Sequence, residues 1–110
     1  MTPISEISAE EFLQRTSQNP VRLIDVRSRE EFAEVRVQGA VNIPLDEITL
    51  EAIQKAHADA SEPLYLICHL GVRSMMACEF LAQNGMQNLV NIAGGTDACM
   101  TAGVPVGRGE

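Results

Sequence analysis

Short apolar runs and amphipathic segments follow one another along the chain, and they predict strands and helices in turn. Strands are expected where β-branched and other apolar residues cluster, at 21–26, 40–44, 63–68 and 88–92. Helices are expected where capping signals or helical spacing occur, at 8–16, 28–35, 49–59, 74–85 and 96–103. The pattern therefore predicts an alternation of helices and strands.

Local signals mark the ends of several of these segments. The pattern Ser-x-x-Glu, typical of a capping box, begins the helices at 8–16 and 28–35. Pro44 ends a strand because it has no N–H group for the ladder. Gly85 and Gly103 are good helix stops. The tail GVPVGRGE, 103–110, is the only segment expected to be loose.

Alternating helices and strands indicate an α/β fold with a mainly parallel sheet and helices on both faces. The run at 63–68 is apolar without alternation, which suits a strand covered on both sides. The 110 residues suffice for one core, so one domain is expected. In such sheets ligands bind beyond the carboxyl ends of the strands, and Cys68 stands at such an end.

Composition narrows the possible partners and compartments. Fifteen acidic against eight basic residues give a net charge of -7, which disfavours nucleic acid and anionic membranes as partners. No apolar run approaches the roughly 20 residues that span a bilayer. The N-terminus lacks the basic and apolar regions of a signal peptide. With three cysteines, an odd number, we expect free thiols and a cytoplasmic protein.

The segment Cys68-His69-Leu70-Gly71-Val72-Arg73-Ser74 carries the candidate chemistry, because it joins a buried strand to a helix. A sharp turn there would direct several peptide N–H groups inward, and the helix adds its own unpaired N–H groups. Gly71 permits a backbone angle that a side chain would block. Arg73 adds a positive charge. Together these features favour a nucleophilic thiolate at Cys68 and would hold an anionic group on its sulfur.

Four segments in this order resemble the single-domain rhodanese family: LIDVRSREEF, GAVNIP, LYLICHLGVRS and GGTDACMTAGVPV. The family's active loop looks like Cys-x-x-Gly-x-Arg, matched here from Cys68 to Arg73. The resemblance covers roughly residues 4–106 of one domain, 1–110, and implies three layers around a five-stranded, mainly parallel sheet. It also implies sulfur transfer through a Cys68 persulfide, cradled by the backbone amides of residues 69–73, with no cofactor.

The resemblance implies a small sulfur donor, either thiosulfate or a persulfide, and cyanide or a thiol as the acceptor. A low-turnover sulfur carrier or sensor that binds a partner protein is an alternative. An oxyanion phosphatase or arsenate reductase is a third reading. Phosphatases of this fold carry a loop one residue longer, whereas Cys68 to Arg73 spans six residues, counting both ends. The shorter loop suits a single sulfur atom, so we rank sulfur transfer first.

Residues beside the nucleophile can have structural roles as well as functional ones. Arg73 can support the loop or attract substrate, and Ser74 is expected to cap the helix, with a hydroxyl that can also reach the persulfide. His69 is a candidate base, but a thiolate already stabilised by the loop needs none. Neither His57 nor His69 forms a metal-ligand spacing with a cysteine, so no metal is expected.

Asp25 and Arg27 end the strand at 21–26, at the edge of the sheet that should also hold Cys68. Asp25 is expected to accept N–H bonds in the turn. Arg27 can pair with a nearby acid such as Glu31, or it can bind substrate at the rim of the pocket. Arg27 and Arg29 are both candidate sources of attraction for an anionic donor.

Two segments depart from the family pattern. Residues 35–40, VRVQGA, stand where many members read Gly-His-Ile-Pro-Gly-Ala, so the local turn can differ. Cys99 stands where many members carry tryptophan, so neighbouring side chains must fill the space. A disulfide joining Cys68 to Cys99 or to Cys78 is one hypothesis for these thiols. The alternative is that Cys78 and Cys99 are small buried apolar residues.

Overall fold

A computed structural model describes residues 2–56 and 62–109 and confirms the α/β fold. Five parallel strands form the main sheet in the order β1-β6-β5-β2-β4. Their bounds are β1 (Ile4–Ile7), β2 (Arg22–Asp25), β4 (Val41–Asn42), β5 (Leu64–Ile67) and β6 (Leu89–Ile92). Because β5 lies between β6 and β2, its carboxyl end is at the centre of the sheet edge.

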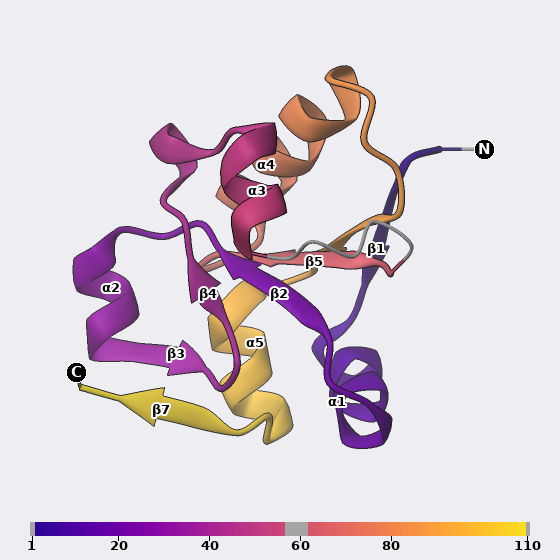
Figure 1. Cartoon of the computed structure of the whole chain (residues 1–110). Helices are drawn as coiled ribbons and strands as arrows, with labels where there is room; N and C mark the ends of the chain where they lie inside the picture. The colour runs from indigo at the N-terminus through magenta and orange to yellow at the C-terminus, as the bar shows by residue number, and fades with distance from the viewer. Residues whose placement is uncertain (1, 57–61, 110) are drawn as a thin grey trace.

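Helices cover both faces of this sheet, as Figure 1 shows. Their bounds are α1 (Ala9–Gln18), α2 (Arg29–Glu34), α3 (Leu50–Ala56), α4 (Val72–Gln83) and α5 (Gly95–Ala102), with a 3-10 turn η1 (Leu45–Glu47). Phe12 of α1 and Cys99 of α5 pack in one apolar cluster, and Ile53 of α3 and Leu81 of α4 in another. Strand residues alternate between the two clusters, so the apolar strands β5 and β6 are buried throughout.

Two strands outside the main sheet correct the predictions for 28–35 and for the tail. Helix α2 ends at Glu34, and β3 (Val35–Val37) begins at the next residue. It pairs antiparallel with β7 (Val106–Arg108), so part of the tail expected to be loose is a strand. The sequences VRV of β3 and VGR of β7 are too short to show a pattern, and the two strands lie about 70 residues apart in sequence.

Strand β1 was also missed, because its sequence ISEI shows only two apolar residues. It becomes a strand by pairing in register with β6, from Ile4 opposite Leu89 to Ile7 opposite Ile92. The last part of the helix predicted at 49–59, including His57, lies outside the described residues. Within the described ranges, none of the helices has the length and apolar character that crossing a membrane requires.

Candidate active site

Cys68 follows β5 directly and is 1% exposed, on the face of the sheet that α4 covers. The chain turns within three residues, and α4 begins at Val72. Gly71 makes this turn possible with a φ of 101°. A Cβ at Gly71 would lie 3.2 Å from the backbone N of Gly94, so both its conformation and its surroundings favour glycine.

The turn brings hydrogen-bond donors to the Cys68 sulfur. The Gly71 N–H donates to Sγ at 3.1 Å, and the Ser74 Oγ lies 3.3 Å from Sγ. Burial raises the pKa of Cys68, but the Ser74 hydroxyl and the N–H groups of Ser74, Gly71 and Leu70 outweigh it and lower the pKa below its ordinary value. The arrangement therefore favours the thiolate.

Helix α5 holds the other side of the loop. The Thr96 N–H and Oγ1 both donate to the Cys68 carbonyl, at 2.8 and 3.1 Å, and the Asp97 N–H donates to the His69 carbonyl at 3.3 Å. In a peptide unit, the C=O of one residue and the N–H of the next point in opposite directions. The Cys68 and His69 carbonyls point toward α5, so the N–H groups that follow them are turned toward the inside of the loop. Gly95 lies against these carbonyls, and a Cβ there would be 2.3 Å from the Cys68 oxygen.

The other two cysteines differ from Cys68 in their surroundings. Burial raises the pKa of Cys78 to about 12 and that of Cys99 to about 11, with neighbouring carboxylates adding to both. All three thiols are free, and Cys99 packs in the cluster on the opposite face from the other two. Cys78 and Cys99 thus lie in apolar surroundings as small buried side chains, as one of the two interpretations predicted.

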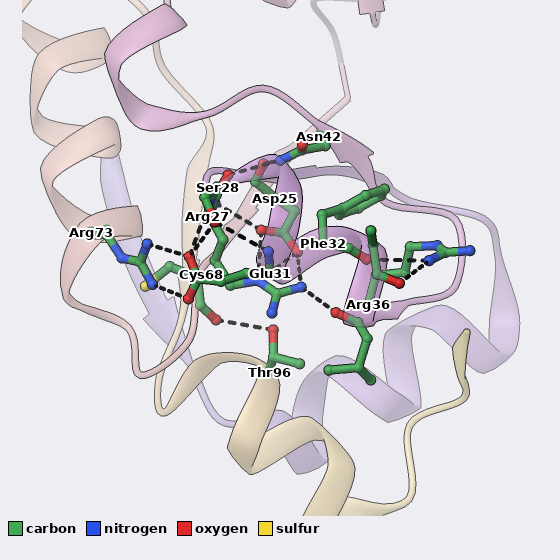
Figure 2. A network of polar contacts seen from close by, with 12 residues as sticks. Asp25, Arg27, Ser28, Glu31, Phe32, Arg36, Asn42, Cys68, Arg73 and Thr96 are labelled. Atoms are coloured by element: carbon green, nitrogen blue, oxygen red, sulfur yellow. Dashed lines mark hydrogen bonds and ion pairs between the residues drawn. The ribbon is translucent and has the colours of Figure 1, made fainter. Parts of the chain in front are cut away.

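Arg73 is bound by a carboxylate from α2. Its two terminal nitrogens donate to the two Glu31 oxygens at 2.8 and 3.0 Å, as Figure 2 shows. This pair lowers the pKa of Glu31 to about 2 and raises that of Arg73. Glu31 also accepts from the Ser28 N–H in the predicted capping box. The pair ties the first turn of α4 to the start of α2, which agrees with loop support by Arg73; its attraction of substrate stays a prediction.

Arg27 is 3% exposed and is paired with Asp25. Its Nε and one terminal nitrogen donate to the Asp25 carboxylate at 2.8 to 3.0 Å, and the same terminal nitrogen donates to the Val35 carbonyl. Asp25 also accepts a hydrogen bond from the Arg27 N–H at 2.9 Å, as expected for an aspartate in this turn. The suggested pairing of Arg27 with Glu31 is wrong, because Glu31 binds Arg73. Substrate binding by Arg27 stays a prediction.

Ser74 has a different position from the one predicted. Gly71 occupies the N-cap position of α4, and Ser74 is fully buried in the first turn, with its hydroxyl beside the sulfur. His69 is half exposed, and its Nε2 lies 3.1 Å from Asp97 Oδ1. Leu70 and Val72 are 59% and 69% exposed, so the outer wall of the loop is apolar.

Three contacts of the loop were missed from the sequence. Glu31, Thr96 and Asn91 hold Arg73, the Cys68 carbonyl and Ser74 respectively. The sequence places Glu31 in a capping box and offers it as a partner for Arg27, and it places Thr96 in a predicted helix, but neither residue is predicted to contact the loop. In the described parts of the chain, no group of three or more His, Cys, Asp or Glu side chains is placed to hold a metal ion.

The comparisons with known proteins agree with this geometry. The family model of the rhodanese-like domain matches residues 8–102. The chain belongs to the rhodanese-like domain family. It is 38% identical over 77 residues to the thiosulfate sulfurtransferase PspE of Escherichia coli, covering 70% of this chain and 73% of that protein.

A second curated relative and a solved structure are also similar to this chain. The putative sulfur carrier protein YrkF of Bacillus subtilis is 34% identical over 93 residues; the match covers 84% of this chain and about half, 49%, of YrkF. The crystal structure of a rhodanese-related protein from Thermoplasma volcanium superposes with a TM-score of 0.74 at 30% identity and covers 93% of this chain and 96% of that one. PspE is thus named as a sulfurtransferase and YrkF as a putative sulfur carrier, and both are similar to this chain of the rhodanese-like domain family.

Proposed function

We propose that the protein is a sulfurtransferase in which Cys68 carries the transferred sulfur as a persulfide. The observation that supports this most directly is the Gly71 N–H at 3.1 Å from a sulfur whose other neighbours also favour the anion. We also propose that residues 1–110 form a single rhodanese-like domain with a core of about residues 4–106. A cytoplasmic location, where thiols stay reduced, is part of the same proposal.

The proposed reaction has two displacements at sulfur. The Cys68 thiolate attacks the outer sulfur of thiosulfate, the S–S bond of the donor breaks, and sulfite leaves with the electron pair. The loop N–H groups then hold the terminal, negatively charged sulfur of the persulfide. Cyanide or a thiolate attacks that sulfur, and the Cys68 thiolate leaves. Electrons balance without an oxidant or a cofactor.

The first test is intact mass after incubation with thiosulfate. Wild-type protein is expected to gain one sulfur atom, Cys68→Ser none, and the matched control Cys78→Ala one, because Cys78 lies on the same face of the sheet in apolar surroundings. Continuous production of thiocyanate with cyanide then shows turnover. A gain of sulfur that persists in Cys68→Ser would contradict the proposal.

The arrangement of Arg73 is evidence against the phosphatase reading. Its guanidinium is bound bidentately by Glu31, and the loop is six residues long, so the loop fits a small terminal sulfur better than an oxyanion. We expect wild-type protein to leave aryl phosphates intact. Efficient hydrolysis of aryl phosphates with no response to thiosulfate would reverse this ranking.

A carrier of sulfur for a partner protein is the second candidate function, and exposed apolar side chains beside the loop favour it. The loop and the outer side of α4 expose Leu70, Val72, Met76 and Phe80, between 44% and 69% each. Such a surface beside the nucleophile suits a protein donor or acceptor. Stoichiometric persulfide formation with negligible turnover on cyanide would favour the carrier over the enzyme.

A further inference from the structure

A chain of hydrogen bonds leads from the Cys68 sulfur through the core to strand β1. The Ser74 Oγ lies 3.3 Å from Cys68 Sγ and 2.5 Å from Asn91 Oδ1. The Asn91 Nδ2 lies 2.8 Å from Glu6 Oε2 and 3.2 Å from the Gly71 carbonyl oxygen. Ser74 and Asn91 are both 0% exposed, so water does not replace these contacts.

The chemistry of the partners determines which group donates at each link. A carboxylate and a carbonyl can only accept, so the Asn91 amide must turn its nitrogen toward Glu6 and Gly71. Its oxygen then faces Ser74 and can only accept. The Ser74 hydroxyl has a single proton, and that proton cannot go to Asn91 and to the Cys68 sulfur at once.

The two acceptors matter in different states of the sulfur. A hydrogen bond from the Ser74 hydroxyl stabilises a thiolate strongly. It stabilises a neutral sulfur, as in the thiol or the inner sulfur of a persulfide, only weakly. We propose that Asn91 is a positioning residue of the reactive loop: held in one orientation by Glu6, it competes with the Cys68 sulfur for the Ser74 proton. Asn91 thereby restrains the ionisation of Cys68.

This inference rests on the proposed function only in taking Cys68 as the nucleophile. The charged and titratable groups around the loop are the Glu6 carboxylate from β1 and three pairs of side chains. The pairs are the ion pairs of Arg73 with Glu31 and of Arg27 with Asp25, and the contact of His69 with Asp97. The pairs are separate from the Glu6–Asn91–Ser74 chain, and all of them remain in the variants that test it.

The test is the pH dependence of Cys68 alkylation by iodoacetamide, with the modified peptide located by mass spectrometry. Ser74→Ala is expected to raise the midpoint, since the sulfur loses a donor. Asn91→Leu frees the hydroxyl for the sulfur and is expected to lower the midpoint by about one pH unit. The double variant should behave like Ser74→Ala. A midpoint that Asn91→Leu leaves unchanged or raises overturns the inference, as does an equal lowering in the Ser74→Ala background.

Glu6→Gln tests the same chain without a change in the core, because Glu6 is exposed. A glutamine amide can donate as well as accept, so the Gly71 carbonyl alone then favours one orientation of Asn91, and that orientation is held less strictly. The midpoint should fall in the wild-type background and stay constant in the Ser74→Ala background. A fall of the same size in both would show an effect of charge alone and overturn the inference. Glu79→Gln, which removes an exposed carboxylate from α4, is the matched control and should cause no shift.

Alkylation requires a thiolate but no sulfur donor, so the two proposals fail separately. If thiosulfate transfers no sulfur while these shifts occur, the donor is wrong and the role of Asn91 stands. If sulfur is transferred while the shifts are absent, the sulfurtransferase stands and the role of Asn91 is wrong.

Discussion

Alanine in place of Gly95 should disturb the reactive loop from outside it. Gly95 has a φ of +59°, and a Cβ there would lie 2.3 Å from the Cys68 oxygen and 2.6 Å from the His69 oxygen. Ordinary van der Waals contact begins at 3.4 Å, and backbone atoms cannot swing aside as a flexible side chain can. The Cys68 carbonyl must therefore retreat, and its hydrogen bonds from Thr96 weaken or break.

The cost in stability can be worked out against a matched control, the glycine at the C-cap of the same helix. Gly103, which follows α5, has a φ of +89° with nothing within 4 Å of its Cβ position. Gly103→Ala should cost only the left-handed backbone, about 1–2 kcal/mol. Gly95→Ala adds two weakened buried hydrogen bonds, about 1 kcal/mol each, for a total of about 3–4 kcal/mol. The effect of alanine on the unfolded chain is common to both variants and cancels in the comparison.

Urea unfolding measures these losses in free energy. The rate of Cys68 persulfide formation shows whether the loop keeps its geometry around the sulfur. A shift of the reacting atom by about 1 Å can slow a reaction about 100-fold, so Gly95→Ala should be slow while Gly103→Ala keeps the wild-type rate. If the two variants lose equal stability and react equally fast, α5 does not hold the loop in the way described.

Three further predictions follow from charges and burial. Since its pKa is about 2 in the folded protein and 4.5 ordinarily, Glu31 should stabilise the fold above about pH 4.5 and lose that contribution as the pH falls toward 2. Urea unfolding of Glu31→Gln should therefore differ from wild type by about 1 kcal/mol at pH 7, a value reduced because water partly screens the Arg73–Glu31 pair, and the two proteins should converge in acid. A constant difference at all pH values would contradict this. Iodoacetamide at pH 7 should modify Cys68 alone, because the pKa values of Cys78 and Cys99 are about 12 and 11, and the mass spectrum of Cys68→Ser should show no adduct. One residue inserted between Leu70 and Gly71 should abolish persulfide formation, measured by intact mass, because it moves the Gly71 N–H from the sulfur; retained formation would show that this N–H is dispensable.

Much of the site was accessible from sequence because its parts are adjacent in the chain. An apolar run, a cysteine, a glycine and a helix start within eleven residues predict a turn with N–H groups around a sulfur, and the structure has this turn. The two capping boxes were equally local, and the structure shows that of Ser28 with both of its hydrogen bonds. The errors at the ends of α2 and α4 came from competing local signals. Val35 can extend the helical pattern of α2 as readily as it can begin a strand. Serine is a residue type that often caps helices, which favoured Ser74, but Gly71 occupies the N-cap position of α4.

Local pattern thus determined the alternation of elements, the parallel sheet and the place of Cys68 at a strand end. The tertiary structure alone decided which distant groups complete the site: Glu31 on Arg73, Thr96 on the Cys68 carbonyl, and Asn91 on Ser74. It also decided that β1 and β7 are strands. The physical reason is the same in each case. A hydrogen bond or ladder between residues far apart in sequence depends on where the packed layers place them, and periodicity carries no information about that.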